Sequence, residues 1–92
     1  MLVMVVYDIS VEGEGAKVQR NIYKACISYL RSFQKSAFIG EITEKQKDRL
    51  VDKLDAIARD KEDVVDIFYT DYPNNVNRLT LGIKRKGTDN II

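Results

Sequence analysis

The side chains available for chemistry in this chain are carboxylates, lysines, arginines and tyrosines, because it contains no His and only one Cys. A Ser-His-Asp triad and a Cys-His dyad are excluded, and zinc cannot be held by imidazoles or by four thiolates. Any metal ion must be bound by oxygen atoms, which favours Mg²⁺ or Mn²⁺ over softer cations. Acid–base chemistry would likewise depend on carboxylates, Tyr, Lys or water.

Asp8 is the candidate metal ligand. It directly follows an apolar run, Leu2 to Tyr7, whose composition predicts a buried central strand. A carboxylate at the end of such a strand can face a metal ion at a sheet edge or at the seam between two subunits. The alternative is a plain turn residue that begins the loop Ser10 to Gly15.

A basic stripe is predicted on the first helix, at about residues 15–30. At ~100° per residue, four cationic side chains fall within a narrow arc opposite the apolar face: Lys17, Arg20, Lys24 and Arg31. Such a stripe gives salt-dependent, sequence-independent affinity for a phosphate backbone. The alternative is a solvated helix face. A basic cluster at Lys84 to Lys86 favours nucleic-acid binding, although the pI of about 7.8 is below that of strongly basic binders.

Other notable residues favour structural interpretations. Gly13-Glu14-Gly15 lies between a strand and a helix but completes no phosphate-binding motif, so we interpret it as a flexible loop. Cys26 is predicted to pack in the core. Asp66 interrupts an apolar strand, so it must face solvent or a partner and could mark a subunit seam. The aromatic side chains are predicted to be core or interface rather than base-stacking residues: Phe33, Phe38, Phe68 and Tyr69.

The elements that must position these side chains form an α+β pattern. Residues 32–42 are β-like and fit either a tight hairpin near Lys35-Ser36 or one bent strand. Thr43 to Gln46 matches a capping box, which predicts a second helix that ends near Asp60 and carries an Asp55–Arg59 ion pair. Strands are predicted at Val64–Thr70 and Arg78–Lys84, separated by a turn at Tyr72–Asn75. This order favours a ferredoxin-like βαββαβ sandwich with an extra C-terminal strand.

The length of 92 residues fits a single domain, predicted at residues 1–84 with a loose basic tail at 85–92. The net charge of +1 is unevenly distributed: residues 1–35 carry +2, residues 36–72 carry −4 and residues 73–92 carry +3. An anionic partner is therefore expected at the first third and the tail. The unpaired Cys26, with no secretory signal and no membrane span, predicts a cytoplasmic protein without a membrane partner.

Two segments carry a resemblance to a known family. Val5 to Ser10, followed by a loop and a helix, resembles the opening of the CRISPR-associated protein Cas2 family. Phe33 to Glu41 is similar to that family's V-Q-x-S-V-F-E-G segment, and Val64 to Tyr69 stands where the family has its fourth strand. The resemblance covers residues 1 to about 84.

The resemblance implies a ferredoxin-like fold and a homodimer in which two copies of Asp8 hold one Mg²⁺ or Mn²⁺ ion. Asp8 is then also the candidate catalytic residue of a metal-dependent endoribonuclease or endodeoxyribonuclease. The family acts in CRISPR adaptation, where it bridges the integrase Cas1 and holds double-stranded prespacer DNA; single-stranded RNA is a further implied substrate. The resemblance also implies that residues 78–84 pack on the partner's sheet.

The chain departs from the family at the second motif. Many members have an Arg two residues before the motif's Gln, a position held here by Ser32, with Arg31 displaced by one. On a regular strand this displacement turns Arg31 to the opposite face. The resemblance favours two functions: a DNA-binding adaptation subunit and a metal-dependent nuclease. A ferredoxin-like regulatory or ligand-binding module without a nucleic-acid function is the alternative.

Overall fold

The structure is a computed structural model, and it describes residues 1–72 and 76–82. The predicted turn at 72–75 is therefore described only at Tyr72, and the predicted tail at 85–92 lies outside the described residues. The elements follow in the order β1 (Leu2–Ile9), α1 (Gly15–Ile27), β2 (Arg31–Gln34), β3 (Ala37–Glu41), α2 (Glu44–Ile57), β4 (Asp63–Thr70) and β5 (Asn77–Gly82).

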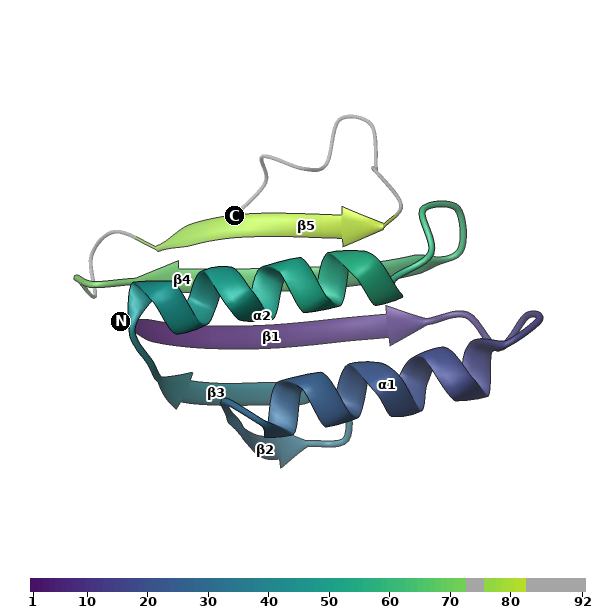
Figure 1. Cartoon of the computed structure of the whole chain (residues 1–92), viewed down its shortest axis with the longest axis horizontal. Helices are drawn as coiled ribbons and strands as arrows, with labels where there is room; N and C mark the ends of the chain where they lie inside the picture. Colours follow the sequence, from purple (N-terminus) through teal and green to yellow (C-terminus); the bar gives the residue numbers. More distant parts are fainter. Residues whose placement is uncertain (73–75, 83–92) are drawn as a thin grey trace.

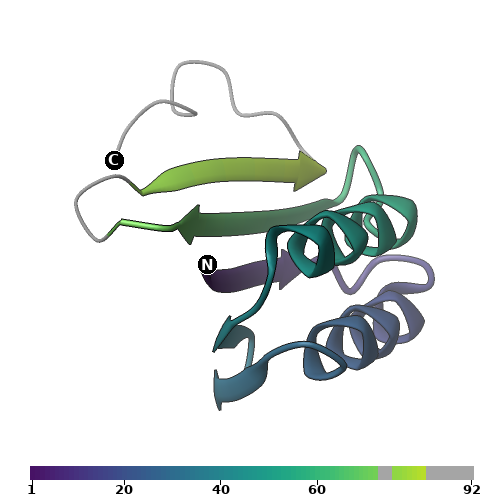
Figure 2. The ribbon, with the colours of Figure 1, turned by 60° about the vertical axis from the view of Figure 1, so that its left-hand side comes forward.

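The five strands form one sheet in the order β2-β3-β1-β4-β5, and every neighbouring pair is antiparallel. Both helices lie on the same face of this sheet (Figures 1 and 2). The predicted ferredoxin-like α+β fold with an extra C-terminal strand is confirmed. Of the two alternatives for residues 32–42, the hairpin is found, and Lys35 and Ser36 form its turn.

The core lies between the helices and one face of the sheet. On β1 the buried side chains are Val3, Val5 and Tyr7, and they pack with residues of both helices. Cys26 is fully buried there, as predicted, and its burial raises the pKa of the thiol to about 12. The alternate residues of β1 point to the other face of the sheet. Neither helix of the described chain has the length and hydrophobicity that a membrane crossing requires.

Helix α1 buries the predicted apolar face, including Val18, Ile22, Ala25 and Cys26. It ends at Ile27, earlier than expected, because the amides of Tyr29 and Leu30 both donate to the Cys26 carbonyl and turn the chain toward β2. Arg31 therefore begins a strand and is not part of the helix.

Helix α2 begins at the predicted capping box. The amide of Gln46 donates to Thr43 Oγ1 at 3.1 Å, and the amide of Thr43 donates to Gln46 Oε1 at 2.9 Å. Leu50 and Leu54 are fully buried beneath the helix. It ends at Ile57 rather than near Asp60, because Ala58 adopts an extended backbone conformation.

Strand β5 pairs with β4 of its own chain over Val64 to Tyr69. The short connection after β4 returns the chain directly along that strand, so pairing within one chain closes a local hairpin. One edge of Asn77–Gly82 is thereby occupied within its own sheet, and residues 83–84 lie outside the described part. Packing of residues 78–84 on a partner's sheet stays a prediction.

Candidate functional site

Asp8 lies on the face of the sheet opposite the helices. It is exposed, it pairs with Val64 of β4, and it follows the buried Tyr7, whose ring stacks against Phe38 at 6.0 Å between centroids. The Tyr7 amide donates to the Ser36 carbonyl, and burial, with a smaller effect of Cys26 and Tyr23, raises the pKa of the Tyr7 hydroxyl. A rigid strand thus presents a carboxylate to the outside.

Asp8 shares its side of the sheet with an apolar surface, which we call the open face. Paired residues of neighbouring strands project to the same side, and the register Met4↔Ile39 and Met4↔Phe68 places these three side chains together. By the same alternation the apolar residues that define the open face are Leu2, Met4, Val6, Ile39, Val64 and Phe68, which are half-buried or exposed. The polar residues that project to the same side around them are Glu41, Asp66, Thr70, Arg78 and Thr80. No helix of the described residues covers it (Figure 2).

A single chain does not complete a metal site around Asp8. Across residues 1–72 and 76–82, no three His, Cys, Asp or Glu side chains lie close enough to bind one ion together. The chemistry of a carboxylate fits Mg²⁺ or Mn²⁺, but these ions need further oxygen ligands in octahedral geometry. An ion bound at Asp8 would therefore need ligands from water, a nucleic acid or a second copy of the chain.

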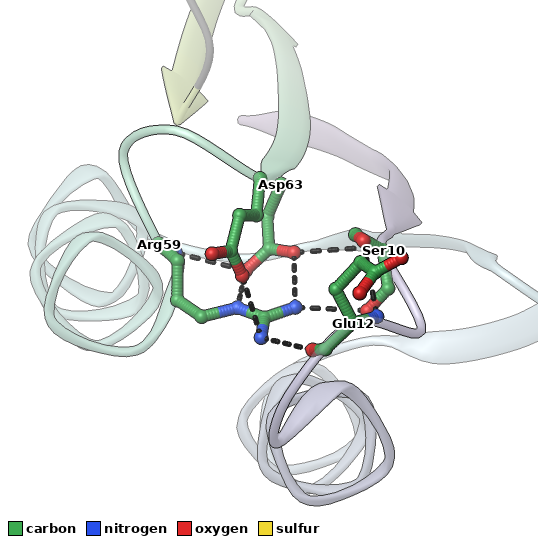
Figure 3. A network of polar contacts seen from close by, with 5 residues as sticks. Ser10, Glu12, Arg59 and Asp63 are labelled. Atoms are coloured by element: carbon green, nitrogen blue, oxygen red, sulfur yellow. Dashed lines mark hydrogen bonds and ion pairs between the residues drawn. The ribbon is translucent and has the colours of Figure 1, made fainter.

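The loop that follows Asp8 is fixed by a polar network that the sequence did not reveal (Figure 3). Asp63 is completely buried; it accepts from Arg59 Nε and Nη2, each at 2.9 Å, and from the Ser10 amide at 3.1 Å. The Arg59 guanidinium also donates to the carbonyls of Ser10 and Glu12, at 2.8 and 2.7 Å. We call these four residues the Arg59–Asp63 clamp, and it ties the loop after β1 to the start of β4.

The clamp keeps the Asp63 carboxylate charged. Burial alone would raise its pKa, but the combined hydrogen bonds from Arg59 and Ser10 and the adjacent guanidinium charge hold the pKa below its ordinary value. The predicted Asp55–Arg59 ion pair is wrong, because α2 ends before Arg59 and helical spacing does not apply. Arg59 instead pairs with Glu62 at 2.8 Å and with Asp63.

The basic stripe of α1 consists of Lys17, Arg20 and Lys24, all exposed on the side of the molecule that carries the helices. Arg31, which the sequence placed in this stripe, is instead the first residue of β2. Asp8 lies on the opposite face of the sheet from α1. The structure of one chain therefore does not bring Asp8 and the stripe into a common site.

A β-bulge in β2 decides where Arg31 points. Arg31 pairs with Ile39 and Gln34 pairs with Ala37, so the register shifts by one residue between Ser32 and Gln34. Ile39 and Ala37 share a face of β3, hence Arg31 and Gln34 also share a face. The prediction that the one-residue displacement turns Arg31 away is wrong, because the bulge absorbs the additional residue.

Asp66 has partners within its own chain. It accepts a hydrogen bond from Thr80 Oγ1 at 2.6 Å, and its carboxylate pairs with the Arg78 guanidinium at 3.0 Å. Cross-strand pairing with β5 thus accounts for this charge beside the open face.

The glycine loop before α1 has a steric explanation. A Cβ on Gly15 would lie 2.0 Å from the Ser10 carbonyl oxygen, so the close packing of the loop requires glycine there. Glycine is therefore structural here, but its reason at position 15 is close packing rather than the flexibility that the sequence predicted.

Of the four aromatic residues predicted to be core or interface, Phe38 is fully buried, and Phe68 and Tyr69 are half-buried. Phe33 is 50% exposed, which neither its apolar character nor its spacing indicated. All four residues of the edge strand β2 are exposed, and the bulge falls at Phe33.

The chain is similar to known proteins over nearly its whole length. A sequence profile of the family described as CRISPR associated protein Cas2 matches residues 1–77. A CRISPR-associated endoribonuclease Cas2 of Fusobacterium nucleatum is 35% identical over 92 residues, covering 100% of this chain and 87% of that protein. The protein named CRISPR-associated endoribonuclease Cas2 2 of Moorella thermoacetica is 34% identical over 90 residues, covering 97% and 99%. The crystal structure of Streptococcus pyogenes Cas2 at pH 6.5 superimposes with a TM-score of 0.69 at 28% identity, covering 76% of this chain and 86% of that one.

Proposed function

Because this chain belongs to the Cas2 family of CRISPR-associated proteins, we propose that it acts in CRISPR adaptation as a homodimer that holds prespacer DNA and bridges the integrase Cas1. The observation that carries nucleic-acid binding is a cationic segment. Residues 15–40 contain five basic side chains and no carboxylate, whereas the other residues contain ten basic and fourteen acidic ones. All five cations are exposed: Lys17, Arg20, Lys24, Arg31 and Lys35.

The open face supports a dimer. A chain of this size buries a modest core, so covering a further apolar surface adds stability. Leu2 is 42% exposed at one end of this face, and Asp8 lies at the other end of the same strand. Two chains that pack these faces together would bury the apolar centre and bring two Asp8 carboxylates toward one another.

The DNA-holding role is tested by removing the stripe. In the Lys17→Gln, Arg20→Gln, Lys24→Gln triple variant, we expect weaker duplex binding. The slope of log affinity against log salt concentration should fall by about one unit for each phosphate that the variant no longer neutralises. A matched triple variant replaces Lys45, Arg49 and Lys61, which are exposed in the acidic part of the chain. Equal effects of the two triple variants on affinity and slope would contradict the proposal.

Metal-dependent endoribonuclease activity is the second function, favoured by the placement of Asp8 and by the names of the two relatives. Asp8 of each copy would supply a carboxylate to Mg²⁺ or Mn²⁺. When bound, such an ion lowers the pKa of water and neutralises charge on a phosphate. Asp8 would hold the ion from a rigid strand. The chain offers no imidazole as a general base, so we expect the proposed reaction to be slow. Adaptation and hydrolysis are separable, because the first needs binding alone.

A further inference from the structure

We propose that the exposed ring of Phe33 stacks on an unpaired base of single-stranded nucleic acid, whose phosphates are held by the cations of α1 and β2. This inference rests on the proposed nucleic-acid binding and adds to it a residue that discriminates single strands from duplexes. Nothing in the function above requires Phe33.

The segment that contains Phe33 carries cationic side chains and no acidic ones. Helix α1 and strand β2 are joined by the short segment Ser28 to Leu30 and lie beside one another at one edge of the sheet (Figures 1 and 2). Arg31 and Lys35 stand two positions before and after Phe33 on the hairpin, and Lys24 lies in the last turn of α1. Arg31 projects to the side of Ile39 and Lys24 to the helical side, so cations lie on both sides of this edge. A polyanion that follows these side chains meets no acidic residue from position 15 to position 40.

The bulge presents Phe33 to the outside. All four residues of β2 are exposed, and the register shift falls at Phe33, where the strand bends away from regular pairing. The Ser32 hydroxyl donates to the Gln34 carbonyl at 2.9 Å, so a hydrogen bond spans Phe33 and fixes the local backbone. The ring is therefore held half outside the protein at the edge of the sheet, on a short, pinned strand.

An exposed aromatic ring between cations is the recognition chemistry of single strands. Every base has a π-face that can stack on such a ring, while Lys and Arg follow the phosphates, so binding tolerates any sequence. In a duplex both faces of an internal base are already stacked on its neighbours. Phe33 should therefore discriminate unpaired from paired nucleic acid, while the cations bind both.

The test compares the affinities of labelled single-stranded RNA, single-stranded DNA and duplex DNA. Phe33→Ala should weaken single-strand binding about 5- to 150-fold and change duplex binding less than twofold. The slope of log affinity against log salt concentration for Phe33→Ala should equal that of the wild-type protein, because no charge is removed. Tyr72→Ala, which removes an aromatic ring that is 70% exposed outside the cationic surface, serves as the matched control.

A spectroscopic readout separates stacking from a structural effect. The chain contains no Trp, so Phe33→Trp introduces a single reporter that should keep the affinity and lose fluorescence when a single strand stacks on it. The proposal would be overturned if the fluorescence of Phe33→Trp did not change upon binding. It would also be overturned if Phe33→Ala lost the same affinity for single strands and for duplexes, or if Phe33→Ala became a monomer. If the wild-type protein binds no nucleic acid, the proposed function fails as well. If only the Lys17, Arg20 and Lys24 variant loses binding, the function stands and this inference fails.

Discussion

At the scale of single residues, substitution of Asp8 distinguishes a protein that hydrolyses nucleic acid from one that only binds it. We expect Asp8→Asn to abolish Mg²⁺-dependent cleavage of labelled RNA, because the amide cannot supply the anionic oxygen that a hard cation requires. Duplex binding and Cas1-dependent integration should stay within about twofold of wild type, because the cationic segment is untouched. Cleavage is measured on gels at matched purity.

The control for Asp8→Asn is Asp52→Asn, which removes the same charge from the exposed side of α2. If Asp8→Asn and Asp52→Asn cleave RNA at the same rate, the nuclease is not centred on Asp8. Loss of integration in Asp8→Asn alone would show instead that the carboxylate serves adaptation.

At the scale of elements, the sequence predicts features that depend on neighbouring residues but not those that depend on residues distant in the chain. The capping box at Thr43 and the apolar face of α1 are set by neighbours in sequence, so both were predicted correctly. Asp63 was missed because its burial depends on Arg59 and on Ser10, which lies 53 positions away. The bulge at Phe33 was missed because it exists only in the pairing of β2 with β3.

The Arg59–Asp63 clamp joins elements that are distant in the chain, so its loss should be costly. We expect Asp63→Asn to lower the free energy of unfolding by about 2–4 kcal/mol, because it leaves the guanidinium and the Ser10 amide without an anionic acceptor. Urea unfolding of Asp63→Asn, with Asp52→Asn as the exposed control, measures this difference. A loss no larger than that of the control would contradict it.

The stabilisation by the clamp should depend on pH. The pKa of Asp63 is lower in the folded chain than its ordinary value of 3.8, so the unfolded chain binds more protons near that pH. The contribution is fully present above about pH 4 and is lost as the pH falls through the lower folded-state value. The stability difference between wild type and Asp63→Asn should therefore shrink below about pH 4. A difference that stays constant into strong acid would mean that the carboxylate does not act through its charge.

At the scale of the whole molecule, the sheet separates two surfaces with different proposed roles. The helical side carries the stripe of Lys17, Arg20 and Lys24, while the opposite side carries Asp8, the open face and, on the edge strand β2, Arg31. The sequence predicted these residues and the fold, but it assigned Arg31 to the helix. Only the order of the strands shows which residues share a face. This arrangement leaves the stripe of α1 accessible when two chains pack through their open faces.

Met4 lies at the centre of the open face, between Ile39 and Phe68, and it therefore tests the dimer directly. We expect Met4→Lys to convert the dimer to a monomer, because pairing the faces would bury two like charges without partners. Light scattering after size-exclusion chromatography measures the mass. Ile27→Lys, a substitution of the same kind on α1 at a side chain that is 45% exposed, should remain a dimer. Because hydrolysis is proposed to need two copies of Asp8, Met4→Lys should also lose cleavage, whereas a monomer that still cleaves would refute the shared metal site.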